Sequence, residues 1–189
     1  MIEVEVRGQL TKEGYERLKA LLQKEGKHVE SHSREMIRLY DYPGFAEDSN
    51  LREVDIRLRD TDGDCEIMVK RKAAENNVAR HELSLKLKDT DLHTAKEVVK
   101  ALGYSKGLKM HRLKEVYSYA GIEWSLVHAP PLYFYFEAEQ EAECADDIPR
   151  IEEGLRRAAG ELSLDVFSPE EYRAFIEVLT RDVNEVIRW

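Results

Sequence analysis

Apolar and charged residues alternate along several stretches of this chain, and a period of two is the pattern of a β-strand. Near the N-terminus, for example, Ile2 and Val4 alternate with Glu3 and Glu5. Stretches of this kind predict strands at about residues 2–8, 34–41, 54–60, 64–72, 79–87, 110–119, 121–128 and 132–140.

Turn and helix-capping residues separate the expected strands. Thr61–Asp64 and Ala120–Gly121 are short enough for hairpins, so the strands that flank each turn should be antiparallel. Four helices are predicted: one capped by Thr11 and ending near Gly26, one capped by Asp91 and ending at Gly103, one over about residues 146–160, and one that starts at Ser168 and runs towards Trp189. The last start combines a capping serine, a proline and an acid three residues on, which is a typical helix N-terminus.

These elements predict an α+β fold, an eight-stranded antiparallel closed β-barrel with helices packed outside. Parallel winding fits poorly, because most connections are too short for the crossovers that parallel strands need. A barrel of about eight strands can hold its own side chains or one small ligand. The sequence contains no repeat, low-complexity tract or linker, so we expect residues 1–189 to form a single domain, C-terminal helices included.

Composition and charge narrow the class of protein. A net charge of −9 argues against general nucleic-acid binding, for which a basic domain is typical. The N-terminus lacks the basic leader and apolar core of a signal peptide, and no apolar run reaches the roughly 18 residues that cross a bilayer. Cys65 and Cys144 have no metal-ligand spacing, which favours reduced thiols. We therefore expect a cytoplasmic protein that binds neither nucleic acid nor membrane.

Charged side chains share one face on six of the expected strands, opposite the apolar face. They are the basic residues Arg7, Arg57, Arg59, Lys70, Lys72, Arg80, Arg112 and Lys114 and the glutamates Glu3, Glu5, Glu82, Glu137 and Glu139. An ordinary half-exposed antiparallel sheet also alternates charged and apolar residues, and its charged face is simply solvated. In a closed barrel, however, the charged face can line the lumen.

A charged lumen of this composition would suit a metal-bound polyanion. Paired carboxylates are hard oxygen ligands for Mg²⁺ or Mn²⁺, which usually add phosphate oxygens and waters. Arginine grips two phosphate oxygens at once and lysine supplies a compact charge. The eight basic residues exceed the five glutamates by three, an excess that would attract a triphosphate but not an uncharged sugar.

The ordered set of motifs resembles the CYTH domain, the family of triphosphate tunnel metalloenzymes that contains thiamine triphosphatases, inorganic triphosphatases and class IV adenylate cyclases. That family begins with Glu-x-Glu-x-Lys, and this chain begins with Glu3-Val-Glu5-Val-Arg7. The later family motifs read here as Arg57-Leu-Arg59, Lys70 with Lys72, Arg80-His-Glu82, Arg112-Leu-Lys114 and Glu137-Ala-Glu139. Each motif is weak by itself, but the set follows the family's order over nearly the whole chain.

The resemblance implies a tunnel enzyme that depends on Mg²⁺ or Mn²⁺. The glutamates would hold the metal, with Glu5 and Glu139 in catalytic roles, and the eight basic residues would bind the substrate. The implied reaction is hydrolysis of a small triphosphate compound, which could be inorganic triphosphate, thiamine triphosphate or a nucleoside triphosphate.

Several positions depart from the family pattern. Arg7 replaces the first lysine, Ser84 stands where a second acid often follows Glu82, and Arg38 lies near the place of an acid in the second strand. These departures leave two alternatives open: a class IV-type adenylate cyclase, or a non-catalytic module that binds polyphosphate or a nucleotide. For the oligomeric state, a homodimer is the alternative to a monomer that we consider.

Overall fold

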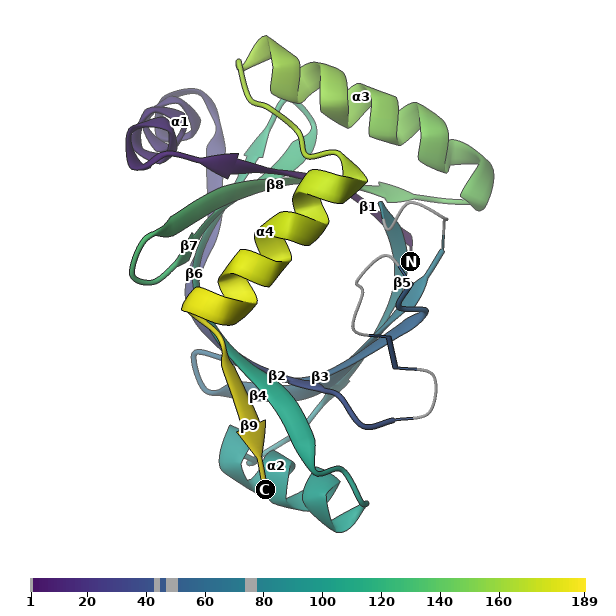
Figure 1. The fold of residues 1–189 in the computed structure, drawn as a ribbon. Coiled ribbons are helices and arrows are strands. Elements are labelled where there is room, and N and C mark those ends of the chain that lie inside the picture. Colours follow the sequence, from purple (N-terminus) through teal and green to yellow (C-terminus); the bar gives the residue numbers. More distant parts are fainter. Residues whose placement is uncertain (1, 43–44, 47–50, 74–77) are drawn as a thin grey trace.

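The computed structural model describes residues 2–42, 45–46, 51–73 and 78–189. Its long strands are β1 (Ile2–Leu10), β2 (Lys27–Leu39), β3 (Val54–Thr61), β4 (Asp64–Lys72), β5 (Ala79–Lys86), β6 (Lys106–Tyr119), β7 (Ile122–Ala129) and β8 (Tyr133–Ala142). They pair in the order β2-β3-β4-β5-β1-β8-β7-β6, and β6 pairs again with β2. Every pairing is antiparallel, and the pairing of β6 with β2 closes the eight strands into a ring, as Figure 1 shows. The antiparallel closed arrangement predicted from the sequence is confirmed.

The two short turns form the expected hairpins. Asp62 and Gly63, between β3 and β4, have φ values of 52° and 98°. Ala120 and Gly121, between β6 and β7, have φ values of 53° and 75°. Two successive residues with positive φ are what a type I′ turn requires, and this turn matches the twist of antiparallel strands.

Side-chain caps start three of the helices, which are α1 (Lys12–Glu25), α2 (Leu92–Ala101), α3 (Ile148–Glu161, after a 3₁₀ turn at Ala145–Asp147) and α4 (Pro169–Asp182). Thr11 Oγ1 accepts a hydrogen bond from the backbone N–H of Gly14 at the start of α1. Asp91 caps α2 in the same way. At α4, Ser168 and Glu171 form a reciprocal capping box.

The apolar faces of the strands lie outside the ring, where helices cover them. Val4 and Val6 of β1 pack with Leu22 of α1 and Leu155 of α3 in the largest cluster of buried residues. A second cluster joins apolar residues of β2, β3 and β4 to Ala95 and Val99 of α2. The helices therefore bury the apolar faces from outside, and the charged faces point into the ring.

Helix α4 is placed differently from the other three. It crosses one end of the ring instead of packing against its outer wall, as Figure 1 shows. Its buried residues Phe175 and Leu179 pack against Ala129, Tyr133 and Tyr135 at the end of β7 and the start of β8. The prediction that helices pack outside thus holds for α1, α2 and α3, whereas α4 forms a wall of the interior.

The final helix is also shorter than predicted. It ends at Asp182, and residues Glu185–Arg188 form a ninth strand, β9, which pairs antiparallel with Lys106–Lys109 of β6. Strand β7 pairs with β6 only from Leu113 onward, so the first part of that edge of β6 is available to another strand. Val186 and Ile187 are β-branched residues that suit such a pairing. Strand pairing therefore replaces the last helical turns.

Both cysteines are free, with Cys65 buried and Cys144 exposed. None of the helices in the described ranges combines the length and apolar character that a transmembrane segment requires.

Candidate functional site

The ring encloses a cavity of about 300 Å³, which we call the tunnel. The residues predicted from the sequence that line it are Glu3, Glu5, Arg7, Arg57, Arg59, Lys70, Arg80, Glu82, Arg112, Lys114, Glu137 and Glu139. They come from β1, β3, β4, β5, β6 and β8, so strands far apart in the sequence bring them together. The inward direction of the charged faces is what strand parity predicted.

Lys72 is the predicted residue that the structure does not place in the tunnel wall. It is the last residue of β4, and its Nζ lies 3.8 Å from Oε1 of Glu53, which precedes β3. Parity puts Lys72 on the same face as Lys70, but its position at the end of the strand directs it to this neighbour instead. Its predicted role in substrate binding therefore has no support from its position.

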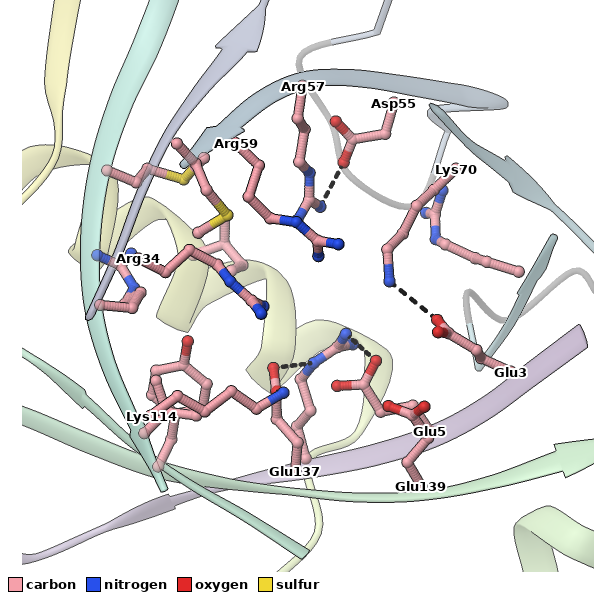
Figure 2. Close-up of a pocket in the computed structure, with 18 of the residues that line it drawn as sticks. Glu3, Glu5, Arg34, Asp55, Arg57, Arg59, Lys70, Lys114, Glu137 and Glu139 are labelled. Carbon is pink, nitrogen blue, oxygen red and sulfur yellow. Dashed lines mark hydrogen bonds and ion pairs between the residues drawn. The ribbon is translucent and has the colours of Figure 1, made fainter. Parts of the chain in front are cut away.

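Carboxylates gather on the wall formed by β1 and β8. Glu5 and Glu139 are register partners in these two strands, and Arg7 is the register partner of Glu137. Glu123 of β7 extends the group, since it pairs in register with Glu139. Figure 2 shows Glu3, Glu5, Glu137 and Glu139 on one side of the cavity.

The opposite side of the cavity is basic. Figure 2 shows Arg34, Arg57 and Arg59, which belong to β2 and β3, facing the carboxylates across the opening. Lys70 and Lys114 lie between the two sides and reach individual acids. Lys70 Nζ is 2.9 Å from Glu3 Oε2 and 2.7 Å from Glu82 Oε2, and Lys114 Nζ is 3.0 Å from Glu137 Oε2.

One guanidinium sits within the acidic wall itself. Arg7 Nε lies 3.3 Å from Glu137 Oε1, and another of its nitrogens donates to Glu5. Burial raises the pKa of Glu137, but Lys114 and Arg7 outweigh this effect and hold it well below its usual range. Glu137 is therefore ionised at neutral pH.

Glu5 and Glu139 are shifted in the opposite direction. Burial raises the pKa of Glu5 to about 7, and the charge of Glu137 adds to the rise while Arg7 opposes it. Burial, together with the charges of Glu5 and Glu3, raises the pKa of Glu139 to about 8. Three acids at neighbouring positions thus differ in protonation, because Lys114 and Arg7 together outweigh burial at Glu137, whereas burial prevails at Glu5 and Glu139.

Arg57 is held in place by an acid of its own strand. Its Nη2 donates to Asp55 Oδ2 at 2.6 Å, and Arg38 Nε donates to the other carboxylate oxygen at 3.1 Å. Burial raises the pKa of Asp55, yet the two guanidinium groups lower it far below its usual range. The acid therefore fixes two arginines at the tunnel wall.

Sequence reasoning assigned no role to several further residues of the wall, which are Glu30, Arg34, Arg38, Arg52, Asp55, Glu123, Tyr135 and Tyr172. Arg34 and Arg38 could have been found, since they alternate with the outward residues Ile37 and Leu39 in β2. Asp55 shares a face with Arg57 by the same rule. Nothing in the pattern of α4 distinguishes Tyr172 from an ordinary residue of an amphipathic helix.

Two departures from the family pattern are balanced by neighbouring strands. Ser84, which stands where a second acid is common, donates to Glu66 of β4, and Glu66 also pairs with Arg59. Arg38, near the usual place of an acid in the second strand, pairs with Asp55 of β3. Each of the two departing residues is therefore in contact with a carboxylate from another strand.

The donor set fits a hard divalent cation that is shared with a ligand. Glu5 Oε1 is buried and has no hydrogen-bond partner in the described structure, so this oxygen is available to coordinate a cation. Within the described ranges, no group of three or more histidine, cysteine, aspartate or glutamate side chains is arranged so that it could hold a metal ion. Mg²⁺ commonly takes one or two carboxylates and completes its shell with phosphate oxygens and water.

Comparisons by sequence and by structure give different results. No family model matches the chain, and no curated protein matches it by sequence. Solved structures do match. The PH1819 protein from Pyrococcus horikoshii has a TM-score of 0.75 and 21% identity, over 93% of this chain and 99% of that protein.

Two further similar structures carry names that refer to nucleotide chemistry. One, named as a candidate adenylate cyclase from Vibrio parahaemolyticus, has a TM-score of 0.70 and 17% identity over 95% of this chain and 98% of its own. The other is HpAC1 from Hippeastrum, a candidate adenylyl cyclase described with a dominant triphosphatase activity. It has a TM-score of 0.53 and 15% identity, over 87% of this chain and 89% of its own. The chain therefore shares the fold of these cyclase- and triphosphatase-type proteins, and its resemblance to the CYTH domain is confirmed at the level of the fold.

Proposed function

We propose that this protein hydrolyses a triphosphate compound in the tunnel, with Mg²⁺ or Mn²⁺ as cofactor. The observation that carries the proposal is the meeting of an acidic wall and a basic wall in one cavity, as Figure 2 shows. Buried charges cost several kcal/mol per ion unless they are paired. A ligand that carries its own charges of both kinds, a phosphate chain with its metal, would satisfy both walls.

The basic residues would hold and orient the phosphates. Arg57 and Arg59 present planar guanidinium groups that can each grip two oxygens. Lys70 and Lys114 are paired with glutamates in the structure. A phosphate group could take over these lysines, because it offers more negative charge than a single carboxylate. The glutamates would then lose their partners.

The glutamates of the acidic wall would hold the metal. Glu3, Glu5 and Glu139 are the main candidates because they lie on adjoining strands, with Glu82 and Glu137 as further ligands. The metal, when bound, would offset phosphate charge and lower the pKa of a coordinated water. The chain's own part is to orient the phosphate chain between the two walls, since positioned charge supplies most of the stabilisation in such reactions.

The direct test is phosphate release from tripolyphosphate, thiamine triphosphate and ATP, with Mg²⁺, with Mn²⁺ and with a chelator. We expect metal-dependent release of orthophosphate from at least one of them, and Glu5→Gln should abolish it. Production of cyclic AMP and pyrophosphate from ATP would instead indicate a cyclase. Folded protein that releases nothing from any of the three compounds would contradict the proposal.

A binding protein without turnover is the second candidate. It is favoured by one observation, that the acids form no ready-made metal group in the described part of the chain. This alternative predicts that tripolyphosphate raises the unfolding temperature equally with and without chelator. A metal-dependent enzyme predicts a larger increase when Mg²⁺ is present, because the metal adds to ligand affinity.

A further inference from the structure

A second cavity opens beside α4, outside the ring. It has a volume of about 670 Å³ and lies between α4, β9 and the ends of β2 and β6; we call it the α4 groove. Arg38, Arg52 and Ile176 line both this groove and the tunnel. The two cavities therefore adjoin at these three residues.

The α4 groove is basic although the protein is acidic. Its charged lining consists of the cations Arg38, Arg52, Lys106, Arg173 and Arg181 and the acids Glu170 and Glu177. Asp182 pairs with Arg181 at 2.6 Å and Asp55 pairs with Arg38 at 3.1 Å, and the five cations still exceed these four acids in a chain of net charge −9. A local excess of this sign in a cleft attracts anions.

Aromatic residues near the groove hold cations. The rings of Tyr40 and Phe45 stack with their centroids 4.6 Å apart. Lys106 Nζ lies 5.2 Å from the centroid of Tyr40, and Arg52 Cζ lies 4.9 Å from the centroid of Phe45. These cation–π contacts position positive charge at the groove. The rings are engaged with each other and with the two cations, which favours an anionic ligand over a flat organic ring.

We propose that the α4 groove binds the phosphates of a linear polyphosphate that extend beyond the three held in the tunnel. This inference rests on the proposed function and deepens it, since it names inorganic polyphosphate of four or more phosphates as the preferred substrate class. Arg38 and Arg52 line both cavities, so a chain that leaves the tunnel past these two residues would enter the groove. Each additional phosphate would meet positive charge instead of bulk solvent.

The test is a series of binding measurements by calorimetry with tripolyphosphate, tetrapolyphosphate, a longer linear polyphosphate and ATP. The altered protein carries Lys106→Ala and Arg181→Ala, two groove residues that do not line the tunnel. Lys24→Ala serves as a matched control, because Lys24 is an exposed lysine on α1. Glu177→Gln is the opposite change, since it removes an acid from the groove.

We expect wild-type protein to bind the longer chain about tenfold more tightly than tripolyphosphate, equivalent to about 1.4 kcal/mol. The double substitution should remove this difference and leave tripolyphosphate binding unchanged, and Glu177→Gln should increase the difference. Lys24→Ala should change neither. Unfolding curves of each variant show whether the fold is retained.

Two results would overturn the inference. One is equal affinity for all chain lengths in the wild type. The other is an ATP affinity that depends on Lys106 and Arg181 more strongly than that of the longer polyphosphate, which would assign the groove to an organic group. Absence of phosphate release from tripolyphosphate would refute the proposed enzyme only, because the binding series decides the role of the groove without turnover.

Discussion

Glu5 of β1 and Glu139 of β8 are register partners whose side chains both enter the tunnel. Two carboxylates at paired positions repel each other when both are ionised. Burial adds to this effect, and the pKa values rise to about 7 for Glu5 and about 8 for Glu139. The two acids therefore retain protons up to near-neutral pH, and a bound cation would favour their ionised forms in place of those protons.

The first prediction concerns stability as a function of pH. Both acids bind protons more tightly in the folded chain than at the ordinary glutamate pKa of 4.5, so the folded state carries more protons between about pH 4.5 and pH 8. Stability should therefore fall as pH rises through this window when a chelator is present. Glu139→Gln should flatten the decline, because the amide does not ionise.

The measurement is the unfolding temperature between about pH 5 and pH 9, where each kcal/mol corresponds to roughly 2–4 °C for a chain of this size. Glu141→Gln is the control, since Glu141 is an exposed residue of the same strand. Identical pH profiles for wild type and Glu139→Gln would show that Glu139 does not cause the decline.

The second prediction concerns Arg57, whose guanidinium points into the tunnel. Arg57→Ala should weaken tripolyphosphate binding by roughly 10- to 100-fold, because a hydrogen bond to a charged group contributes about 1.5–3 kcal/mol. Arg57→Lys should recover only part of the loss, since lysine cannot grip two oxygens. Calorimetry provides the affinities, with Arg150→Ala on the exposed surface of α3 as the control. An unchanged affinity in Arg57→Ala would remove this residue from the site.

The third prediction separates the structural role of Asp55 from the binding role of its arginine partners. Asp55→Asn should lower the unfolding temperature, because Arg38 and Arg57 lose the acid that both contact. Tripolyphosphate should then raise the unfolding temperature of the variant more than that of the wild type. Without the Asp55 carboxylate, Arg38 and Arg57 keep more of their positive charge for the phosphates. A smaller ligand-induced increase than in the wild type would mean that Asp55 mainly orients the arginines for binding.

The fourth prediction tests the packing of β1 beneath the segment that leads to α4. A Cβ at Gly8 would lie 1.9 Å from the carbonyl oxygen of Asp165 and 2.5 Å from Cε1 of Phe136. Gly8→Ala should therefore cost about 3 kcal/mol or more, since backbone must shift to admit the methyl group. Gly154→Ala is the matched control: it lies within α3, and its Cβ would meet nothing within 4 Å.

The control Gly154→Ala should raise the free energy of unfolding by roughly 0.5–1 kcal/mol, because alanine is more favourable than glycine inside a helix. Chemical unfolding curves of both variants give these values. Equal effects of the two substitutions would contradict the close approach of Asp165 to Gly8.

The ring and most of its lining could be predicted from the sequence because strand parity is a local property. Once Val4 and Val6 face the helices outside, Glu3 and Glu5 have to face inward, whatever the rest of the chain does. The two hairpins were equally predictable, since their turns contain Gly63 or Gly121 at positions of positive φ.

The elements that the sequence did not predict depend on distant partners. Residues Glu185–Arg188 form a strand only because the edge of β6 is available beside them. Tyr172 belongs to the tunnel because α4 crosses the ring, and its position along the helix does not reveal this. Lys72 follows the parity of its strand but meets Glu53 at the strand's end. In each case the deciding contact comes from a segment outside the local pattern.

Helix α4 is fastened at both ends. Before it, the N–H of Phe167 donates to the carbonyl oxygen of Arg7 at 2.8 Å. After it, β9 is bonded along β6, and Arg112 donates to Asn184 at 2.9 Å. Helix α4 is therefore held in place across the end of the ring, because moving it aside would break the pairing of β9 with β6. A molecule that enters the tunnel from this end would therefore have to pass beside α4.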